Sequence, residues 1–157
     1  MKSNNNVYFL ARKDAMRYNE RLTREGAAEM IGVSPYTLAD YELGNTKVVP
    51  VDKVVLMADL YNCPELKTGY CKHECPIGKE YPVATKRGNI EGAALRLINE
   101  LNDVGKQQIA EKIMKIAMDG VISADEKPEL GAIMKQLEDM TTAISELMLI
   151  GKKEMRK

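Results

Sequence analysis

Apolar side chains recur at intervals of three and four residues along most of this chain, and that spacing predicts helices. Side chains that cap or stop helices punctuate the pattern: Thr23 and Ser34 suit N-caps, while Gly32 and Gly44 suit helix ends. We expect helices that begin at Val7, span residues 24–31, 35–43, 51–61, 90–101 and 103–118, and begin again at Ser123, where Glu126 completes a capping box. The pattern predicts an all-α fold, in which residues 64–66 form only a short turn.

A segment rich in turn-forming residues divides the predicted helices into two groups. Gly69, Pro76, Gly78, Pro82 and Gly88 all lie in it, so we expect irregular structure there. The predicted organisation is a disordered start at residues 1–6, a five-helix domain at 7–68, a cysteine-containing linker at 69–88 and a three-helix assembly domain at 89–157.

Residues 23–43 have the layout of a helix-turn-helix motif, in which a short helix, a glycine turn and a second helix follow one another. Two small residues, Ala27 and Ala28, allow the helices to approach closely. Val33 and Leu38 are expected to fill the angle between them. The second helix, capped by Ser34 with Pro35 in its first turn, could then place its N-terminal end in a major groove.

The stretch LTREGAAEMIGVSPYTLADYELGN resembles the Xre, or lambda-repressor-like, family of helix-turn-helix regulators. The resemblance covers about 60 of the 157 residues and includes the helices on both sides of the motif. It implies a lambda-repressor-like DNA-binding domain. By position, it assigns DNA contacts to Arg24, Ser34, Pro35, Tyr36, Thr37, Asp40, Asn45, Thr46 and Lys47, and a structural ion pair to Arg17 with Glu42.

The matched positions depart from the family pattern in two places. Pro35 offers no side-chain hydrogen bond, so base reading would fall on Tyr36, Thr37 and Asp40. Asp40 could accept a hydrogen bond from cytosine, but its charge repels phosphate. Specificity would then depend in part on DNA shape and on backbone contacts.

Composition limits the remaining possibilities. The net charge is zero, with 23 basic and 23 acidic side chains, so bulk charge does not favour binding to polyanions. No apolar run is long enough for a membrane span or a signal peptide, and we expect a cytoplasmic protein that does not associate with membranes. We find no nucleophile–base pair and no phosphate-binding glycine loop, so we do not expect an enzyme.

Cys63, Cys71, His73 and Cys75 lie within 13 residues. Thiolates and imidazole are zinc ligands, but the spacing contains no Cys-x-x-Cys pair. The alternative is that Cys63 is a small buried apolar residue and that the others serve local packing. We expect no cofactor and keep zinc as the alternative.

The last helix carries a heptad pattern formed by Leu130, Ile133, Leu137, Met140, Ile144 and Leu147. Met134, Thr141 and Met148 widen this apolar stripe. The helix could fold onto the two preceding helices or form a homodimer interface, and we favour the dimer. A dimer would place two helix-turn-helix motifs on the half-sites of one operator.

These observations favour a sequence-specific DNA-binding regulator that acts as a dimeric repressor on double-stranded DNA, with a regulatory protein as a further possible partner. The alternative is an adaptor or antitoxin-like protein that uses the same fold to bind another protein.

Overall fold

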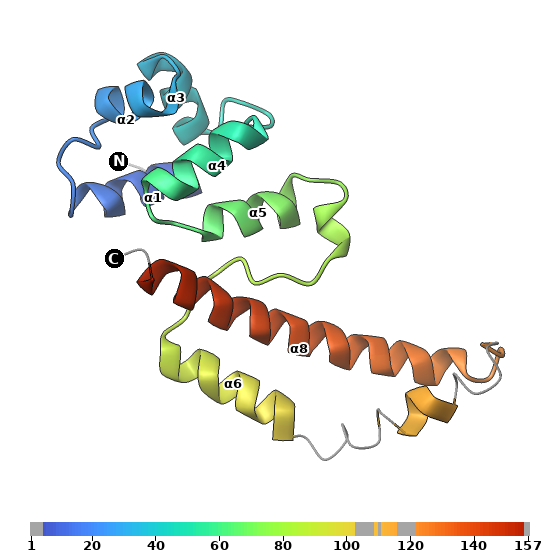
Figure 1. Cartoon of the computed structure of the whole chain (residues 1–157). Helices are drawn as coiled ribbons and strands as arrows, with labels where there is room; N and C mark the ends of the chain where they lie inside the picture. The colour runs from blue at the N-terminus through green and yellow to red at the C-terminus, as the bar shows by residue number, and fades with distance from the viewer. Residues whose placement is uncertain (1–4, 103–108, 110, 116–121, 156–157) are drawn as a thin grey trace. The chain divides into compact units, whose positions relative to one another are not determined.

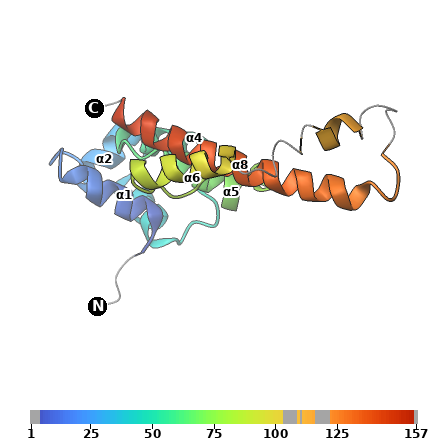
Figure 2. The same cartoon turned by 90° about the horizontal axis from the view of Figure 1, so that it is seen from below.

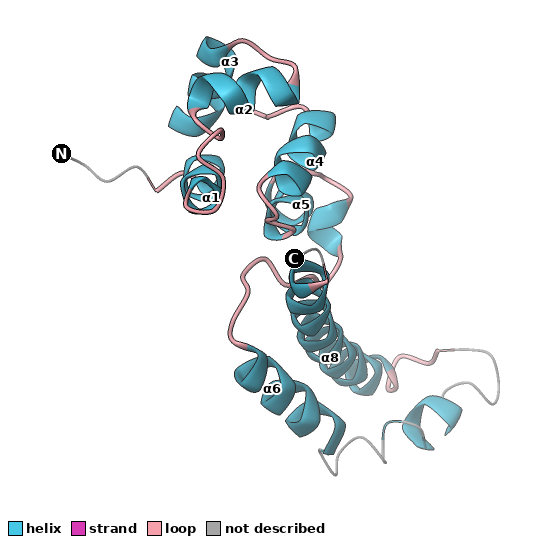
Figure 3. Ribbon diagram, turned by 60° about the vertical axis from the view of Figure 1, so that its left-hand side comes forward, coloured by secondary structure: helices cyan, strands magenta, loops and turns pink. Residues whose placement is uncertain are grey.

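The computed structural model describes residues 5–102, 109, 111–115 and 122–155, and the regular structure in these ranges is helical throughout (Figures 1 and 3). The predicted all-α character is confirmed. The chain divides into two compact units, each described separately below. The N-terminal unit holds the described residues through Tyr81 and those from Lys152 onward, and the C-terminal unit holds Pro82–Gly151.

The N-terminal unit consists of short helices with defined ends. They are α1 (Val7–Met16), α2 (Arg24–Ile31), α3 (Pro35–Leu43), α4 (Val51–Leu60), α5 (Glu65–His73) and the 3₁₀ turn η1 (Gly78–Glu80). Helix α2 has the predicted bounds, and α4 ends one residue before the predicted end. Thr23 and Ser34 cap α2 and α3 as predicted, each accepting a backbone hydrogen bond in the first turn.

Small and branched apolar side chains from α2, α3 and α4 form the core of this unit. Ala27, Ala28 and Leu38 are fully buried at the junction of α2 and α3, and Val33 packs against the same cluster. The predicted close approach of the two helices is confirmed. Full burial of a side chain such as Leu38 stabilises the fold by roughly 1.5–3 kcal/mol relative to exposure.

Helix α1 buries Ala11 and the charged Arg12 on its inner face, whereas the apolar Leu10 is exposed. Helix α5 continues to His73, where only a turn had been predicted, so the first residues of the predicted linker are helical. Glu65 in its first turn and Lys72 in its last turn have the signs that favour a helix.

The C-terminal unit contains α6 (Ile90–Asn102), the helical residues 111–115 and the long helix α8 (Lys127–Glu154) as far as Gly151. Helix α6 lies beside the C-terminal half of α8 (Figures 1 and 2), where Arg96 Nε donates to Glu146 Oε2 at 2.9 Å. Near the other end of α8, buried Ile109 packs against Ile133 and Leu130.

The start of α8 differs slightly from the prediction. The helix begins at Lys127, later than Ser123, although the Ser123 backbone N–H donates to the Glu126 carboxylate at 2.9 Å as in a capping box. The predicted helix over residues 103–118 lies partly outside the described residues. Within the described ranges, every helix is too short or too polar to span a membrane.

Candidate nucleic-acid interface

Two residues in the turn between α2 and α3 set the direction of α3. Gly32 has a φ of 72°, in the left-handed region, and its N–H closes the end of α2 on the carbonyls of Ala28 and Glu29. The Val33 N–H bonds to the Ala28 carbonyl at 3.0 Å. Ser34 then starts α3 with extended backbone angles. The chain therefore changes direction within three residues.

The first turn of α3 lies at the surface. Ser34 and Pro35 are exposed, and Tyr36 has 78% of its surface exposed. Thr37 is half-buried. Its N–H donates to Ser34 Oγ at 3.0 Å, and the two hydroxyl oxygens lie 2.8 Å apart. Tyr36 therefore projects from a first turn whose polar groups are held in place.

Asp40 and Asn45, both assigned to DNA contacts by the family resemblance, bind each other. Asn45 Nδ2 donates to Asp40 Oδ1 at 2.9 Å, across the end of α3. Gly44, with a φ of 75°, allows the chain to turn back in this way. Thr46 is half-buried and Lys47 is exposed in the following loop. The Asp40 carboxylate is thus partly occupied by an amide donor.

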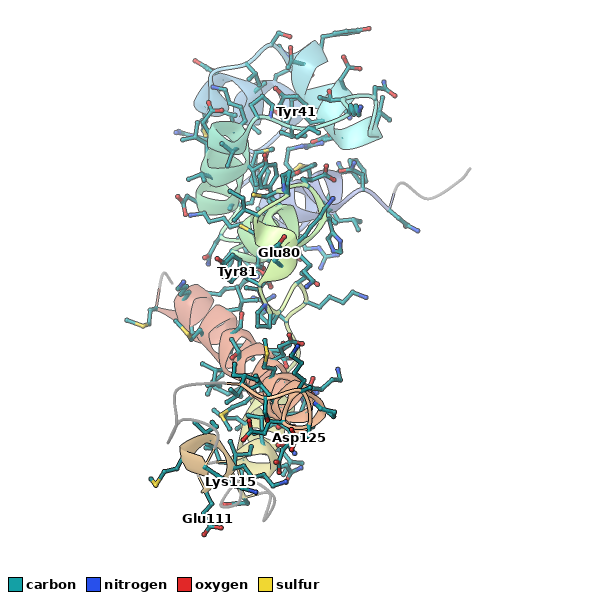
Figure 4. All side chains as sticks on the ribbon, turned by 90° about the vertical axis from the view of Figure 1, so that its right-hand side faces the viewer. Tyr41, Glu80, Tyr81, Glu111, Lys115 and Asp125 are labelled. Carbon is teal, nitrogen blue, oxygen red and sulfur yellow. The ribbon has the colours of Figure 1, made fainter. Side chains whose placement is uncertain are left out.

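Tyr41, labelled in Figure 4, faces the core and is 6% exposed. Its backbone carbonyl accepts a hydrogen bond from Asn6 Nδ2 at 3.0 Å, and this bond ties the N-cap of α1 to α3. Burial raises the pKa of the Tyr41 phenol, and the charge of Asp52 raises it further. The two tyrosines of α3 therefore have different roles, because Tyr36 is exposed and Tyr41 is buried.

The predicted ion pair between Arg17 and Glu42 is wrong. Arg17 lies just beyond the end of α1 and contacts exposed Asp14 at 3.4 Å. Arg12, one helical turn earlier, takes its place and donates to Glu42 through Nε at 2.5 Å and through Nη2 at 3.0 Å. The Arg12 side chain lies on the buried face of α1, whereas the Arg17 side chain lies outside that face.

Arg12 also donates to the Leu22 carbonyl at 3.2 Å, so the buried guanidinium is shared between α3 and the chain before α2. The hydrogen bond with Glu42 raises the pKa of Arg12 and outweighs the opposing effect of burial. The sequence contained a signal for this residue. Tyr8, Ala11 and Ala15 mark the inner face of α1, and Arg12 shares that face by helical spacing.

Arg24, which the resemblance assigns to a phosphate contact, is the second cation bound to Glu42. Its Nε and Nη2 donate to Glu42 Oε2 at 3.0 and 2.9 Å. Its side chain remains 37% exposed. A guanidinium held from one side by a buried carboxylate has a fixed orientation, and its open side is accessible at the start of α2.

The charges around α3 are mixed. The helix has no basic side chain, and of its two acidic residues Glu42 is neutralised in the core while Asp40 is half-buried near the surface. Arg21 and Lys47 are exposed before α2 and after α3. Lys53 Nζ donates to the Ile31 carbonyl at 3.2 Å. Basic groups thus flank the helix rather than cover it.

The structure does not gather the four potential zinc ligands. Cys63 packs against the N-terminal core, and burial raises the pKa of its thiol to about 12. Cys71 and His73 are exposed on α5, and Cys75 Sγ accepts the Gly78 N–H at 3.4 Å. In the part of the chain that the structure describes, no three side chains of His, Cys, Asp or Glu are grouped to hold a metal ion.

The six residues predicted to mediate dimerisation do not share one environment. Ile133 is buried against Ile109, and Leu130, Met140 and Leu147 are partly covered. Of these six residues, Leu137 and Ile144 are exposed.

No family model, no curated protein and no solved structure matches this chain.

Proposed function

We propose that this protein is a sequence-specific DNA-binding regulator that reads double-stranded DNA with the first turn of α3. The observation that carries the proposal is the exposure of Tyr36 at the leading end of a helix whose other end is fixed in the core. An exposed helix end with adjacent hydroxyl groups fits a major groove, where side chains can contact base edges. The resemblance to the Xre family supports the same interpretation.

The flanking groups support binding to the phosphate backbone. Arg24 is oriented by Glu42 and remains accessible, while Arg21 and Lys47 are exposed on either side of the motif. Backbone contacts position a protein on the duplex, and base contacts supply sequence preference. In this proposal Tyr36 and Thr37 reach bases, and Asp40, held by Asn45, accepts a hydrogen bond from a cytosine amino group.

The proposal is tested by selecting a preferred duplex from a random pool with the purified full-length chain and measuring its affinity by fluorescence anisotropy. Tyr36→Ala should weaken binding to that duplex by about tenfold, which corresponds to the loss of one good base contact. Tyr18→Ala is the matched control, because Tyr18 is 87% exposed but lies outside the motif, and its affinity should not change.

Arg24→Ala should weaken binding to all duplexes alike and reduce the salt dependence of the affinity, as expected for a phosphate contact. If the full-length chain binds no duplex even at low salt, the DNA-binding proposal is wrong.

A second function, the binding of a protein partner through the same surface, is favoured by one specific observation. Helix α3 lacks basic side chains and exposes Leu43 in addition to Tyr36. Exposed apolar side chains near an acidic group suit a protein better than a polyanion. Salt dependence separates the two functions, because affinity for DNA falls steeply as salt rises, whereas an adaptor would not bind DNA at any salt concentration.

A further inference from the structure

The side of α3 that faces away from the core carries a distinct set of chemical groups. We call this side the reading face, and it consists of Tyr36, Ala39, Asp40 and Leu43. Their spacing of three and four residues places them together on one side of the helix. Tyr36 and Leu43 are exposed, the latter by 61%, while Ala39 and Asp40 are half-buried between them.

The reading face lacks the side chains that form paired contacts with purines. In the major groove, Arg or Lys contacts guanine through its donors, and Asn or Gln contacts adenine through one donor and one acceptor. None of these four residue types occurs in Pro35–Leu43. The Tyr36 hydroxyl can either donate or accept a hydrogen bond, so it does not discriminate between bases by itself.

The groups that the reading face does offer match the major-groove edges of pyrimidines. Cytosine presents an amino donor, which a carboxylate accepts, and thymine presents a methyl group, which apolar side chains contact. Asp40 can accept from cytosine while it holds Asn45, because an ionised carboxylate has acceptor sites beyond the one that the amide occupies. The Tyr36 ring and the Leu43 side chain are accessible apolar surfaces on either side of it along the helix.

We infer that α3 reads the pyrimidine edges of its site, with a cytosine amino group at Asp40 and thymine methyl groups at Tyr36 and Leu43. This inference rests on the proposed DNA-binding function and names the class of sequence that this function would select. From Tyr36 to Leu43 the helix rises about 10 Å at 1.5 Å per residue. This length matches about three base steps of 3.4 Å. The expected half-site therefore places a cytosine between two thymines.

The same interpretation accounts for the distribution of charge around α3. A face that reads guanine would need a cation, whereas a face that reads cytosine needs an acceptor. The acceptor lies on the reading face, at Asp40, and the cations Arg21, Arg24 and Lys47 lie before and after the helix. Those flanking positions suit phosphate contacts, which carry no sequence information of their own.

Base analogues in the duplex selected from the random pool test the inference with the full-length chain. Replacement of thymine by uracil removes only the methyl group, so each uracil at a contacted position should weaken binding about threefold to fivefold. The matched control replaces the purines by their 7-deaza analogues, which lack the N7 acceptor, and the affinity should stay within about twofold. Replacement of the central C·G pair by T·A should weaken binding about tenfold, because the thymine O4 acceptor would face the Asp40 carboxylate.

A protein variant combined with an analogue identifies the side chain that contacts a methyl group. Leu43→Ala should weaken binding to the thymine duplex about threefold to fivefold, and it should cause no further loss once the contacted thymine is uracil. Val55→Ala is the matched control, because Val55 is 39% exposed on α4, outside the reading face, and this variant should keep the full uracil effect. Circular dichroism checks that both variants stay helical.

The outcomes separate this inference from the function on which it rests. A selected duplex that tolerates uracil at every thymine, or that loses affinity mainly on 7-deaza substitution, would overturn the pyrimidine reading and leave DNA binding intact. A uracil effect that neither Tyr36→Ala nor Leu43→Ala reduces would also overturn it, because another element would then contact the methyl groups. Failure of the wild type to bind any duplex would instead overturn the DNA-binding function itself.

Discussion

Arg12 and Glu42 form a buried ion pair that joins α1 to the helix proposed to read DNA. The two side chains are 3% and 0% exposed, and two nitrogen–oxygen contacts hold them together. Desolvation of two charges is costly, and this cost is offset only when the partners are well oriented and have further hydrogen bonds. Arg24 and the Leu22 carbonyl supply those further hydrogen bonds.

Removal of one partner should therefore destabilise the fold strongly. Arg12→Ala is expected to lower the free energy of unfolding by about 3–5 kcal/mol, because Glu42 would keep its buried charge without its main partner. Urea denaturation measures this change. Arg17→Ala is the matched control on the same segment. Its exposed pair with Asp14 should contribute less than about 0.5 kcal/mol, and equal losses in the two variants would contradict the assignment.

Two glycines should respond in opposite ways to the same substitution. Gly32 has a φ of 72°, so Gly32→Ala is expected to lower the free energy of unfolding by about 1–2 kcal/mol. Gly69 lies inside α5, and a Cβ atom added there would meet nothing within 4 Å. Gly69→Ala should therefore stabilise the unit by roughly 0.5–1 kcal/mol. Thermal unfolding of both variants tests the pair, and a loss of stability at Gly69 would contradict the second expectation.

The sequence predicted the helices of the N-terminal unit well where local signals act alone. Thr23 caps the start of α2, and Gly32 and Ser34 form the turn to α3; each of these residues acts on the backbone at its own position. The ion pair of Glu42 could not be found in that way, because its partner depends on where α1 lies against α3.

Helix α8 shows a second limit of sequence patterns. Heptad spacing predicted one broad apolar stripe, and the sequence alone did not separate the part that folds inward from the part that stays exposed. In the structure Ile133 is buried against Ile109, whereas Met134 and Met148 on the same helix are exposed. For the same reason the cysteines could not be placed from spacing, because Cys63 belongs to the N-terminal core.

Cys63 should make the fold less stable at alkaline pH. Burial raises the pKa of its thiol from 9.0 to about 12, so the folded state holds this proton more tightly than the unfolded chain does. The contribution of the protonated Cys63 thiol to the free energy of unfolding is fully present below pH 9 and is lost as the pH rises from about 9 to about 12. Urea denaturation at pH 8 and at pH 10.5 should show this loss in the wild type and a smaller loss in Cys63→Ala.

The same burial should protect Cys63 from alkylation. Thiolates are the reactive form, so iodoacetamide at pH 8.5 should modify exposed Cys71 well before Cys63. Peptide mass spectrometry distinguishes the two sites, and rapid labelling of Cys63 in the folded protein would show that the thiol is accessible.

Asp40 provides a test of how charge on α3 limits DNA binding. Asp40→Asn removes a negative charge near the proposed phosphate contacts and keeps an oxygen that can accept the Asn45 amide hydrogen bond. The affinity for duplexes of unrelated sequence should therefore rise about twofold to fivefold at low salt, and this gain should shrink as salt screens the charge. At the preferred duplex, the loss of the carboxylate that accepts a hydrogen bond from cytosine should offset this gain in affinity. The ratio between the affinities for the preferred duplex and for unrelated duplexes should therefore decrease.

Asp139→Asn makes the same chemical change in the C-terminal unit and should leave both affinities unaltered, as measured by anisotropy titrations. Equal gains in the two variants would mean that net charge, and not the position of Asp40 on α3, controls the affinity.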